Sequence, residues 1–317
     1  MIETDRLSDL LPWPALIDSL DTIFTKSYCC PIRHHHDISV PGNDNATLLL
    51  MPAWVEGEYL GVKQVNVFPG NAHQGKPGLS SHYLLSSATT GELLARLDGN
   101  IITGRRTAAA AALAARYLSR KNSRRLLMVG AGRVAHQVVP AMLSVRDIEH
   151  IDIWNLDYEQ GAAFAKELNA QGISAHAIEP NRLHEAAANA DIISCATLST
   201  SPLLCGDWIT PGTHVDLIGS FTPHMREADD TLMAKAHVFV DFKEAALQET
   251  GDLIDPVKNG TLREADILGD FLDFSRGLHR GRTALSDDDH AITVFKAVGS
   301  SIEDLAAAIL AYKQLTA

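Results

Sequence analysis

The stretch "LLMVGAGRVA" (126–135) constrains the fold of this chain more than any other. An apolar, strand-like run leads into Gly130 and Gly132, and a helix-like segment opens at Ala135. In such a G-x-G-x-x-A turn the first glycine allows a tight turn. The second lets the backbone approach a pyrophosphate, which the helix N-terminus attracts. The motif alone is weak, but its place between a strand and a helix favours a dinucleotide site.

The sequence after the glycine turn supports this interpretation. Apolar runs alternate there with helical or loop segments, which is typical of a doubly wound parallel sheet. We therefore predict an α/β Rossmann domain over 121–299. We also predict a long amphipathic helix over 291–315, broken near Gly299, which returns to the first domain. The apolar runs lie near 150–154, 173–177, 191–195, 214–218 and 237–241.

Residues 1–120 show no such alternation. Strand-like runs are separated by turn signals, and a hairpin turn leads into a further strand before residue 99. An alanine-rich segment predicts a helix over 107–120. We therefore predict a mixed α+β domain over 1–120, joined by the C-terminal helix at about 300–317. The strand-like runs occupy 46–54, 59–69 and 81–88.

Composition limits the class of protein. The 317 residues are 46% hydrophobic and 21% charged, which is typical of a soluble globular protein. The net charge of −12 disfavours nucleic acid or an anionic membrane surface as a partner. There is no signal-peptide pattern and no apolar run long enough to span a membrane, so we expect a cytoplasmic protein.

Cysteines and histidines do not predict a metal site. The four cysteines form no C-x-x-C pair. Three successive histidines, His34 to His36, cannot all face one metal from an extended strand. We therefore predict no metal.

The end of the second strand of the Rossmann domain bears on the cofactor. An acid there accepts a hydrogen bond from the adenosine 2′-hydroxyl of NAD(H), whereas an arginine would bind the 2′-phosphate of NADP(H). Here the sequence is Asn155, Leu156 and Asp157. Asp157 and the uncharged Leu156 favour NAD(H), and Asn155 is compatible with either cofactor.

Basic residues of the first domain are candidates for binding an anionic substrate. Arg105 and Arg106 are predicted just before the alanine-rich helix, where a guanidinium and backbone N–H groups suit a carboxylate. A solvated surface pair is the alternative. Lys63 lies in an apolar run, either on the polar face of an edge strand or in a cleft. The same two interpretations are open for Arg33.

Several segments, taken together, carry a resemblance to a known family. The most specific are "GRRTAA" and "TVFKAVGSSIEDLA", and "LGVKQVNVFPGN", "VGAGRVA" and "GTHVDLIGSFTP" accompany them. In order and spacing, over nearly the whole chain, they resemble the ornithine cyclodeaminase/mu-crystallin family. This implies a homodimer whose first domain combines dimerisation with substrate binding. The second domain would bind a nicotinamide dinucleotide.

The resemblance also implies roles for individual residues. Arg106 matches the arginine that holds the substrate carboxylate, and Lys63 matches the active-site lysine. Arg33 matches a second carboxylate-binding arginine. Ser81 falls where cyclodeaminases carry a substrate-contacting threonine, and Met51 joins this substrate-binding set. The cofactor-binding residues expected in the second domain are Gly130, Gly132, Arg133, Val134, Asn155, Asp157, Thr197, Gly219 and Lys296.

One departure from the family pattern bears on the reaction. Cyclodeaminases carry an aspartate after the last strand of this segment, which handles the side-chain amine of ornithine. Alignment on Gly219 and Pro223 places Phe221 at that position, and an aromatic ring cannot accept a proton. The resemblance therefore implies the branch that reduces cyclic imines. These are Δ1-pyrroline-2-carboxylate and Δ1-piperideine-2-carboxylate, with L-proline and L-pipecolate as products and Phe221 beside the substrate.

Three other functions stay open on the sequence. An alanine-type amino-acid dehydrogenase would use the same cofactor and carboxylate clamp, but it must also activate water. Ornithine cyclodeaminase activity lacks its aspartate. A non-catalytic, crystallin-like ligand-binding protein would not need Arg106, Lys63 and a complete cofactor loop together. We expect an oxidoreductase acting on C=N bonds with NAD(H) or NADP(H), and we favour NAD(H).

Overall fold

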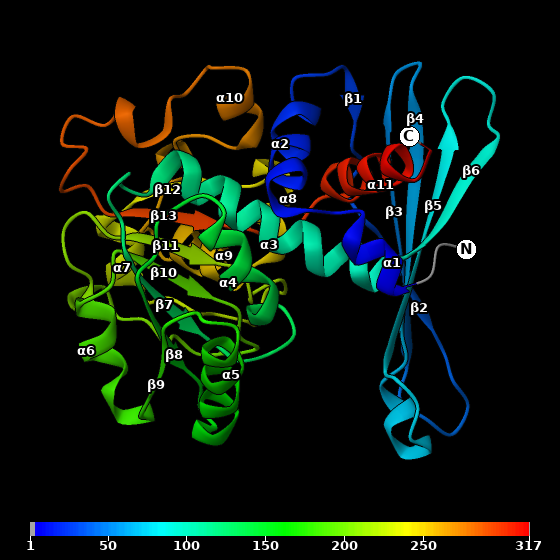
Figure 1. The fold of residues 1–317 in the computed structure, drawn as a ribbon. Coiled ribbons are helices and arrows are strands. Elements are labelled where there is room, and N and C mark those ends of the chain that lie inside the picture. Colours follow the sequence, from blue (N-terminus) through cyan, green and yellow to red (C-terminus); the bar gives the residue numbers. More distant parts are fainter. Residues whose placement is uncertain (1–3, 317) are drawn as a thin grey trace. The chain divides into compact units, whose positions relative to one another are not determined.

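The computed structural model describes residues 4–316 and contains two compact units (Figure 1). Unit 1 comprises the described residues up to Arg106 and those from Ser300 onward, and unit 2 comprises Thr107–Gly299. Within residues 4–316, no helix has both the length and the apolar character needed to cross a membrane.

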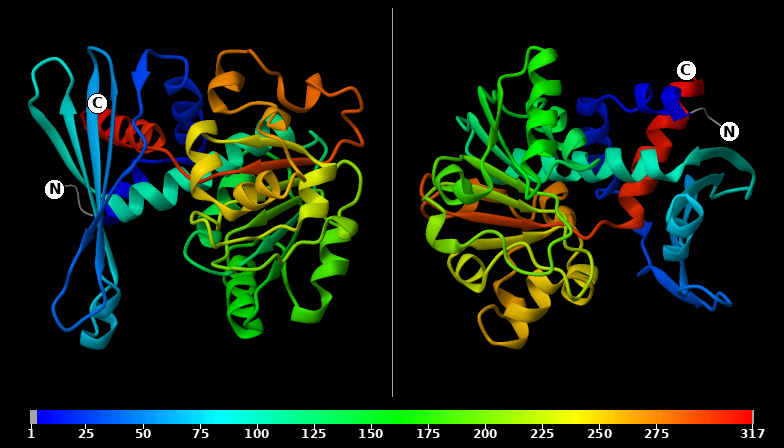
Figure 2. Two further views of the ribbon diagram at one scale, coloured as in Figure 1. Left: turned by 180° about the vertical axis from the view of Figure 1, so that it is seen from behind. Right: turned by 90° about the horizontal axis from the view of Figure 1, so that it is seen from below.

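Unit 1 is an antiparallel sheet with a long helix on one face. The strand order is β1-β3-β4-β5-β6, and β2 also pairs with β3. Helix α11 packs against β3, β4 and β5 (Figure 2), and α2 packs against α11. The elements are α1 (Thr4–Asp9), α2 (Trp13–Ile23), β1 (Tyr28–Cys29), β2 (His34–Ile38), β3 (Ala46–Val55), β4 (Tyr59–Val67), a 3-10 turn (Pro69–Gln74), β5 (Leu79–Ser87), β6 (Leu93–Asp98), the start of α3 (Gly99–Leu118) and α11 (Ser301–Thr316).

Helix α3 begins earlier than its alanine-rich pattern predicts. The Asp98 carboxylate accepts hydrogen bonds from the N–H groups of Asn100 and Ile101, which starts the helix at Gly99 instead of near residue 107. Arg106 therefore lies within the helix and not before it. The prediction of a carboxylate site at a helix N-terminus is wrong at this position.

The boundary between the units also falls inside α3, whereas the sequence pattern placed it after residue 120. The C-terminal end of α3 is bound to unit 2 by two arginines. Arg146 donates to the carbonyl oxygens of Ala115 and Ser119, and Arg282 donates to that of Leu118. Cations on the last carbonyls of a helix are favourable, so this half of α3 packs as part of unit 2.

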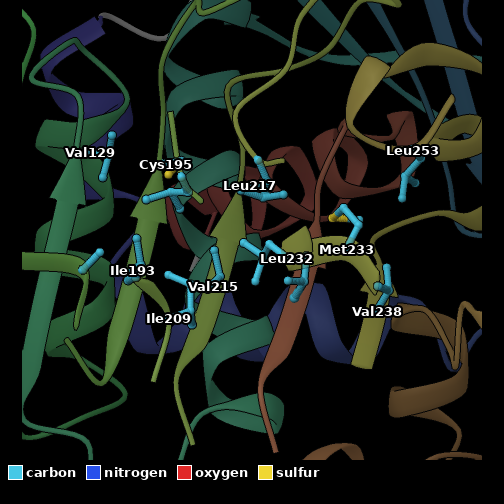
Figure 3. Packing of buried hydrophobic residues seen from close by; sticks show 14 of the residues in the cluster. Val129, Ile193, Cys195, Ile209, Val215, Leu217, Leu232, Met233, Val238 and Leu253 are labelled. Carbon is cyan, nitrogen blue, oxygen red and sulfur yellow. The ribbon is translucent and has the colours of Figure 1, made fainter. Parts of the chain in front are cut away.

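Among the described residues of unit 2, seven parallel strands form one sheet in the order β12-β13-β11-β10-β7-β8-β9. From β7 the chain runs outward to β9 and then restarts at β10 on the other side. Helices α6 and α7 share one apolar cluster with this sheet, to which α7 contributes Leu232 and Met233 (Figure 3). Right-handed crossovers place α4 and α5 on the other face. The predicted Rossmann fold beside an α+β unit is confirmed. The elements are β7 (Arg125–Val129), α4 (Ala135–Leu143), β8 (His150–Trp154), α5 (Tyr158–Ala170), β9 (Ala175–Ile178), α6 (Leu183–Ala188), β10 (Ile192–Cys195), β11 (His214–Leu217), α7 (Asp230–Lys235), β12 (His237–Val240), α8 (Lys243–Glu249), α9 (Gly251–Lys258), α10 (Phe271–Ser275) and β13 (Thr293–Lys296), with 3-10 turns at Pro180–Arg182, Gly206–Trp208, Glu264–Asp266 and Gly281–Ala284.

Strand β13 corrects the prediction of one long helix over 291–315. It lies between β11 and β12, and all four of its residues are buried. A short apolar run that is buried on both faces has no alternation to separate it from a helix. The β-branched Thr293 and Val294 favour the strand. Gly299, with a φ of 80°, separates this strand from α11, as the predicted break near that residue requires.

Candidate active site

A cluster of buried charges in unit 1 joins strand β4 to helices α3 and α11. Lys63 Nζ lies 2.6 Å from Asp304 Oδ2, and Arg106 Nε lies 3.0 Å from Asp304 Oδ1. Arg106 Nη1 lies 3.1 Å from Glu303 Oε2. Each of these side chains is 8% exposed or less. Two cations and two carboxylates are thus held together out of water.

Neighbouring hydroxyls fix the orientation of this cluster. Lys63 Nζ donates to Thr103 Oγ1 at 3.3 Å, and the Ser300 hydroxyl donates to Glu303 Oε1 at 2.9 Å. Glu303 and Asp304 lie in the first turn of α11, where the helix dipole stabilises negative charge. The carboxylates are therefore supported by the helix as well as by their partners.

The surroundings of Lys63 place the titration of its amine within the physiological range. Burial lowers the pKa of Lys63 to about 8, and Arg106 and Arg33 also lower it, whereas Asp304 raises it. Of the two interpretations open on the sequence, the desolvated amine is the one that the structure shows. Arg33, just before β2, is close enough to act on this amine electrostatically.

The structure brings Met51 and Ser81 to the same face of the sheet as Lys63. Met51 is the register partner of Lys63 on β3 and is 3% exposed. Ser81 is buried on β5, and its hydroxyl has no hydrogen-bond partner among residues 4–316. A Cβ at Gly99 would lie 2.1 Å from Ser81 Oγ, so glycine is required at the start of α3.

The two carboxylates of this cluster were not identified from the sequence. Both are fully buried in the segment "SIEDLAAAIL". Adjacent acids in an apolar helix are a usable signal, because buried carboxylates need cationic partners. That signal indicates buried ion pairs, but it does not identify Lys63 and Arg106 as the partners.

In unit 2 the glycine turn after β7 has a shape that fits a pyrophosphate. Gly130 has a φ of 111°, and a Cβ there would lie 2.7 Å from the carbonyl oxygen of Ala196. A Cβ at Gly132 would meet no described atom within 4 Å, so the space beside it is open. Val134 precedes α4, Arg133 is exposed, and among the described residues no side chain caps this helix. The turn therefore leaves open space at a helix N-terminus, where N–H groups suit a phosphate.

The end of β8 supports the glycine turn. Asn155 Oδ1 accepts a hydrogen bond from the N–H of Ala131 at 3.2 Å. Asp157 lies at the position expected for a ribose-binding acid and caps α5 by accepting from the N–H of Glu159. Asn155 therefore holds the glycine turn through a hydrogen bond. The Asp157 carboxylate, two residues later in the sequence, is exposed.

A buried carboxylate that sequence reasoning missed joins the loops after β10 and β11. Glu227 Oε1 accepts hydrogen bonds from the N–H and the hydroxyl of Thr197, both at 2.8 Å, and Oε2 accepts from the N–H of Gly219 at 2.7 Å. Glu227 lies in an irregular segment, "MREADD", which has no periodic pattern to reveal its burial. Thr197 and Gly219 thus direct these donors toward Glu227.

Lys296 is fully buried at the end of β13. Its ammonium donates to the carbonyl oxygen of Leu217 at 2.9 Å and lies 3.3 Å from Asp252 Oδ2. Lys296, predicted to bind the cofactor, therefore stabilises the end of β11 through a hydrogen bond.

Exposed apolar side chains mark the carboxyl edge of the parallel sheet. Leu156, Leu198 and Phe221 follow β8, β10 and β11 and are 80%, 78% and 48% exposed. Ligands of doubly wound sheets bind at this edge, next to the point where strand order reverses. These side chains leave exposed apolar groups at that edge, as is common at ligand-binding sites.

Among the described residues, one group of possible metal ligands lies elsewhere in unit 2. His150 and Asp152 on β8 and His176 on β9 place ligand atoms within 4.8 Å of one another. His150 Nε2 lies 2.8 Å from Asp152 Oδ1, and Arg125 lies 3.9 Å from Asp152 Oδ2. The carboxylate therefore already has two cationic or hydrogen-bonding neighbours.

Comparisons with known proteins agree with this architecture. The Ornithine cyclodeaminase/mu-crystallin family matches residues 15–317. A Δ1-pyrroline-2-carboxylate reductase of Paracoccus denitrificans is 40% identical over 95% of this chain and 91% of its own. The Δ1-pyrroline-2-carboxylate reductase of Thermococcus litoralis, solved with NADH and L-proline, has a TM-score of 0.88 at 32% identity, covering 98% of this chain and 96% of that one. An archaeal alanine dehydrogenase dimer with bound NAD has a TM-score of 0.88 at 28% identity, covering 98% and 94%. The chain therefore belongs to the ornithine cyclodeaminase/mu-crystallin family.

Proposed function

We propose that this protein reduces a cyclic imino acid with NAD(H). The substrate is Δ1-pyrroline-2-carboxylate, Δ1-piperideine-2-carboxylate or both, and the product is L-proline or L-pipecolate. The observation that carries the proposal is the buried cluster in which Arg106 and Arg33 act on the Lys63 amine. The names of full-length relatives and the NADH and L-proline bound to the Thermococcus litoralis enzyme support it.

Arg106, assisted by Arg33, binds the substrate carboxylate. Its Nε and Nη1 are held by Asp304 and Glu303, so the plane of the guanidinium is fixed before substrate arrives. A fixed, planar guanidinium orients a carboxylate better than a flexible ammonium does. Met51 and Ser81 are proposed to contact the substrate ring.

Lys63 handles the proton. Reduction of a C=N bond requires a hydride at carbon and a proton at nitrogen, and bound NAD(H) would supply the hydride. With a pKa of about 8, the Lys63 amine carries a proton near neutral pH and can release it without a large penalty. We assign it to donate this proton directly or through water, with Asp304 compensating its charge.

The cofactor is assigned to unit 2, and the open space beside Gly132 is the observation that fits its pyrophosphate. Leu156 offers no charge for a 2′-phosphate, so NAD(H) is preferred over NADP(H). The residues proposed to bind or position the cofactor are Gly130, Gly132, Arg133, Val134, Asn155, Asp157, Thr197, Gly219 and Lys296.

A second candidate activity is that of an alanine-type dehydrogenase, favoured by the likeness to the archaeal enzyme. That reaction needs a group to activate water, whereas cyclic imine reduction does not. Phe221 argues against deamination of ornithine, because a ring there offers no carboxylate for a side-chain amine. Two assays separate the three activities. One measures loss of nicotinamide absorbance with each cyclic imine and with pyruvate plus ammonia. The other measures ammonia release from L-ornithine.

We also propose that the protein forms a homodimer through unit 1. Side chains alternate along the sheet, and the face opposite Lys63 carries Trp54, Leu60, Val62 and Leu84. Leu84 is 43% exposed, and Val62 is its register partner. Gln64, His82 and Arg96 lie on the same face around these apolar side chains. An exposed apolar patch with a polar border is typical of an association surface. The archaeal alanine dehydrogenase is a dimer.

A further inference from the structure

The loops after β10 and β11 are held together by one side chain. Glu227 is fully buried and accepts three hydrogen bonds, two from Thr197 and one from Gly219. The two loops are thus bridged through both oxygens of one carboxylate.

The two loops pack too closely to admit a side chain at Gly219. A Cβ at Gly219 would lie 2.0 Å from the carbonyl oxygen of Thr197 and 2.5 Å from Glu227 Oε1. A Cβ at Gly130 would lie 2.7 Å from the carbonyl oxygen of Ala196. The glycine turn and both loops therefore pack closely against one another.

A second layer of contacts holds the backbone of Glu227. The N–H of Glu227 donates to Asp252 Oδ1 at 2.8 Å, and the Lys296 ammonium lies 3.3 Å from Asp252 Oδ2. Lys296 also holds the carbonyl oxygen of Leu217, the last residue of β11. Lys296 contacts Asp252 and acts electrostatically on Glu227, so two buried acids depend on one buried lysine. Burying these charges is costly unless the arrangement fixes a geometry.

The position of the bridge relates it to one half of a dinucleotide. Strand order reverses between β7 and β10, so the adenosine half is expected on the β7 and β8 side and the other half over β10 and β11. The bridged loops carry the exposed Leu198 and Phe221. Glu227 therefore acts only on the half that would hold the nicotinamide.

We propose that Glu227 is a positioning residue that holds the loops after β10 and β11 in the shape that binds the nicotinamide half of the cofactor. This inference rests on the proposed function, because it takes NAD(H) as the ligand. Glu227 itself is buried and acts through Thr197 and Gly219.

The test compares two ligands on the Glu227→Gln variant. Glutamine keeps the size of the side chain, but its amide nitrogen cannot accept a hydrogen bond, so one loop loses its partner. We expect the Kd for NADH to rise about tenfold, the effect of one lost hydrogen bond to a charged group. The Kd for ADP, which occupies only the adenosine half, should stay unchanged.

Asp229→Asn is the matched control. Asp229 Oδ1 also accepts from two backbone N–H groups, those of Gly206 and Leu232, but it serves the start of α7. Asparagine retains the accepting Oδ1, and we expect neither Kd to change. If Glu227→Gln does not fold, Thr197→Val removes the hydroxyl donor alone and should give a smaller loss confined to NADH.

Two results would overturn the inference. One is an unchanged Kd for NADH in folded Glu227→Gln, and the other is an equal loss of NADH and ADP, which indicates a general structural role. Failure of the wild-type protein to bind NADH would overturn this inference and the cofactor assignment together. NADH binding without imine reduction would contradict only the proposed reaction.

Discussion

Among single residues, Lys63 shows how burial and one ion pair together set the pKa of a side chain. Burial and the nearby arginines lower the pKa of Lys63, and Asp304 raises it, so the amine titrates at about 8. The 2.6 Å contact with Asp304 stabilises the protonated form of Lys63, which burial alone would disfavour. The same pair also holds Arg106, which shares Asp304.

Replacing Lys63 by methionine should abolish most of the turnover. Methionine keeps the length of the side chain but carries no proton, and proton transfer by a positioned side chain contributes about 100-fold or more to a rate. We expect kcat for imine reduction to fall by about that factor while the Kd for NADH is unchanged. Lys26→Met, which breaks a partly exposed pair with Glu58, is the control. Unchanged kcat in Lys63→Met would remove the lysine from the mechanism.

Replacing Asp304 by asparagine should shift the pH dependence. Asp304 raises the pKa of Lys63, so its neutralisation moves that pKa below about 8. Lys63 is protonated below its pKa, and the alkaline limb of kcat/KM should therefore move to lower pH. Glu303→Gln is the control, because Glu303 contacts Arg106, and we expect it to raise KM without moving the limb. A limb that stays in place in Asp304→Asn would show that Lys63 does not supply the proton.

At the scale of elements, the turn between β7 and α4 contains two glycines that are required for different reasons. Gly130 needs glycine because of its φ of 111° and its contact with Ala196. Gly132 has open space where a Cβ would stand, so folding does not require glycine there. The proposed role of Gly132 is to leave room for the pyrophosphate of the cofactor.

Alanine at these two positions should separate folding from binding. Gly130→Ala combines a disfavoured φ with a Cβ placed 2.7 Å from the carbonyl oxygen of Ala196. We therefore expect a lower melting temperature and weak NADH binding. Gly132→Ala should leave the melting temperature unchanged or slightly higher, as alanine reduces the entropy of the unfolded chain. Its Kd for NADH should rise about tenfold or more. Thermal unfolding and NADH titration of both variants measure this, and wild-type affinity in Gly132→Ala would contradict the pyrophosphate assignment.

At the level of the whole molecule, the dimer proposed above would form through the face of the unit 1 sheet that lies opposite Lys63. Val62→Glu places a charge at the centre of this apolar face, beside Leu84. By light scattering after size exclusion, we expect a dimer for the wild-type protein and a monomer for this variant. Leu278→Glu, at a 70% exposed position of unit 2, is the control and should stay dimeric. A dimeric Val62→Glu would place the interface elsewhere.

The elements that local patterns encode were predicted well. The glycine turn, the strands at 126–129 and 150–154, and the mixed first domain follow from periodicity and turn residues. Strand β13 was missed, because a strand buried on both faces has no polar alternation. The start of α3 was misplaced, because its cap is Asp98 and not the alanine-rich boundary.

The charged networks were not predictable in the same way. Arg106 and Asp304 lie 198 residues apart, and Thr197 and Glu227 lie 30 apart in segments without a shared pattern. Single residues such as Lys63 and Arg106 were identified because they lie in motifs. Their buried partners depend on how distant segments pack, which no local signal of the chain specifies.

A steady-state assay of the wild-type protein with NADH and Δ1-pyrroline-2-carboxylate tests the proposed reaction directly. We expect loss of nicotinamide absorbance that depends on the imine, with one L-proline formed per NADH consumed. We expect no ammonia release from L-ornithine. Turnover of L-ornithine, or NADH oxidation with pyruvate and ammonia but with neither cyclic imine, would contradict the account.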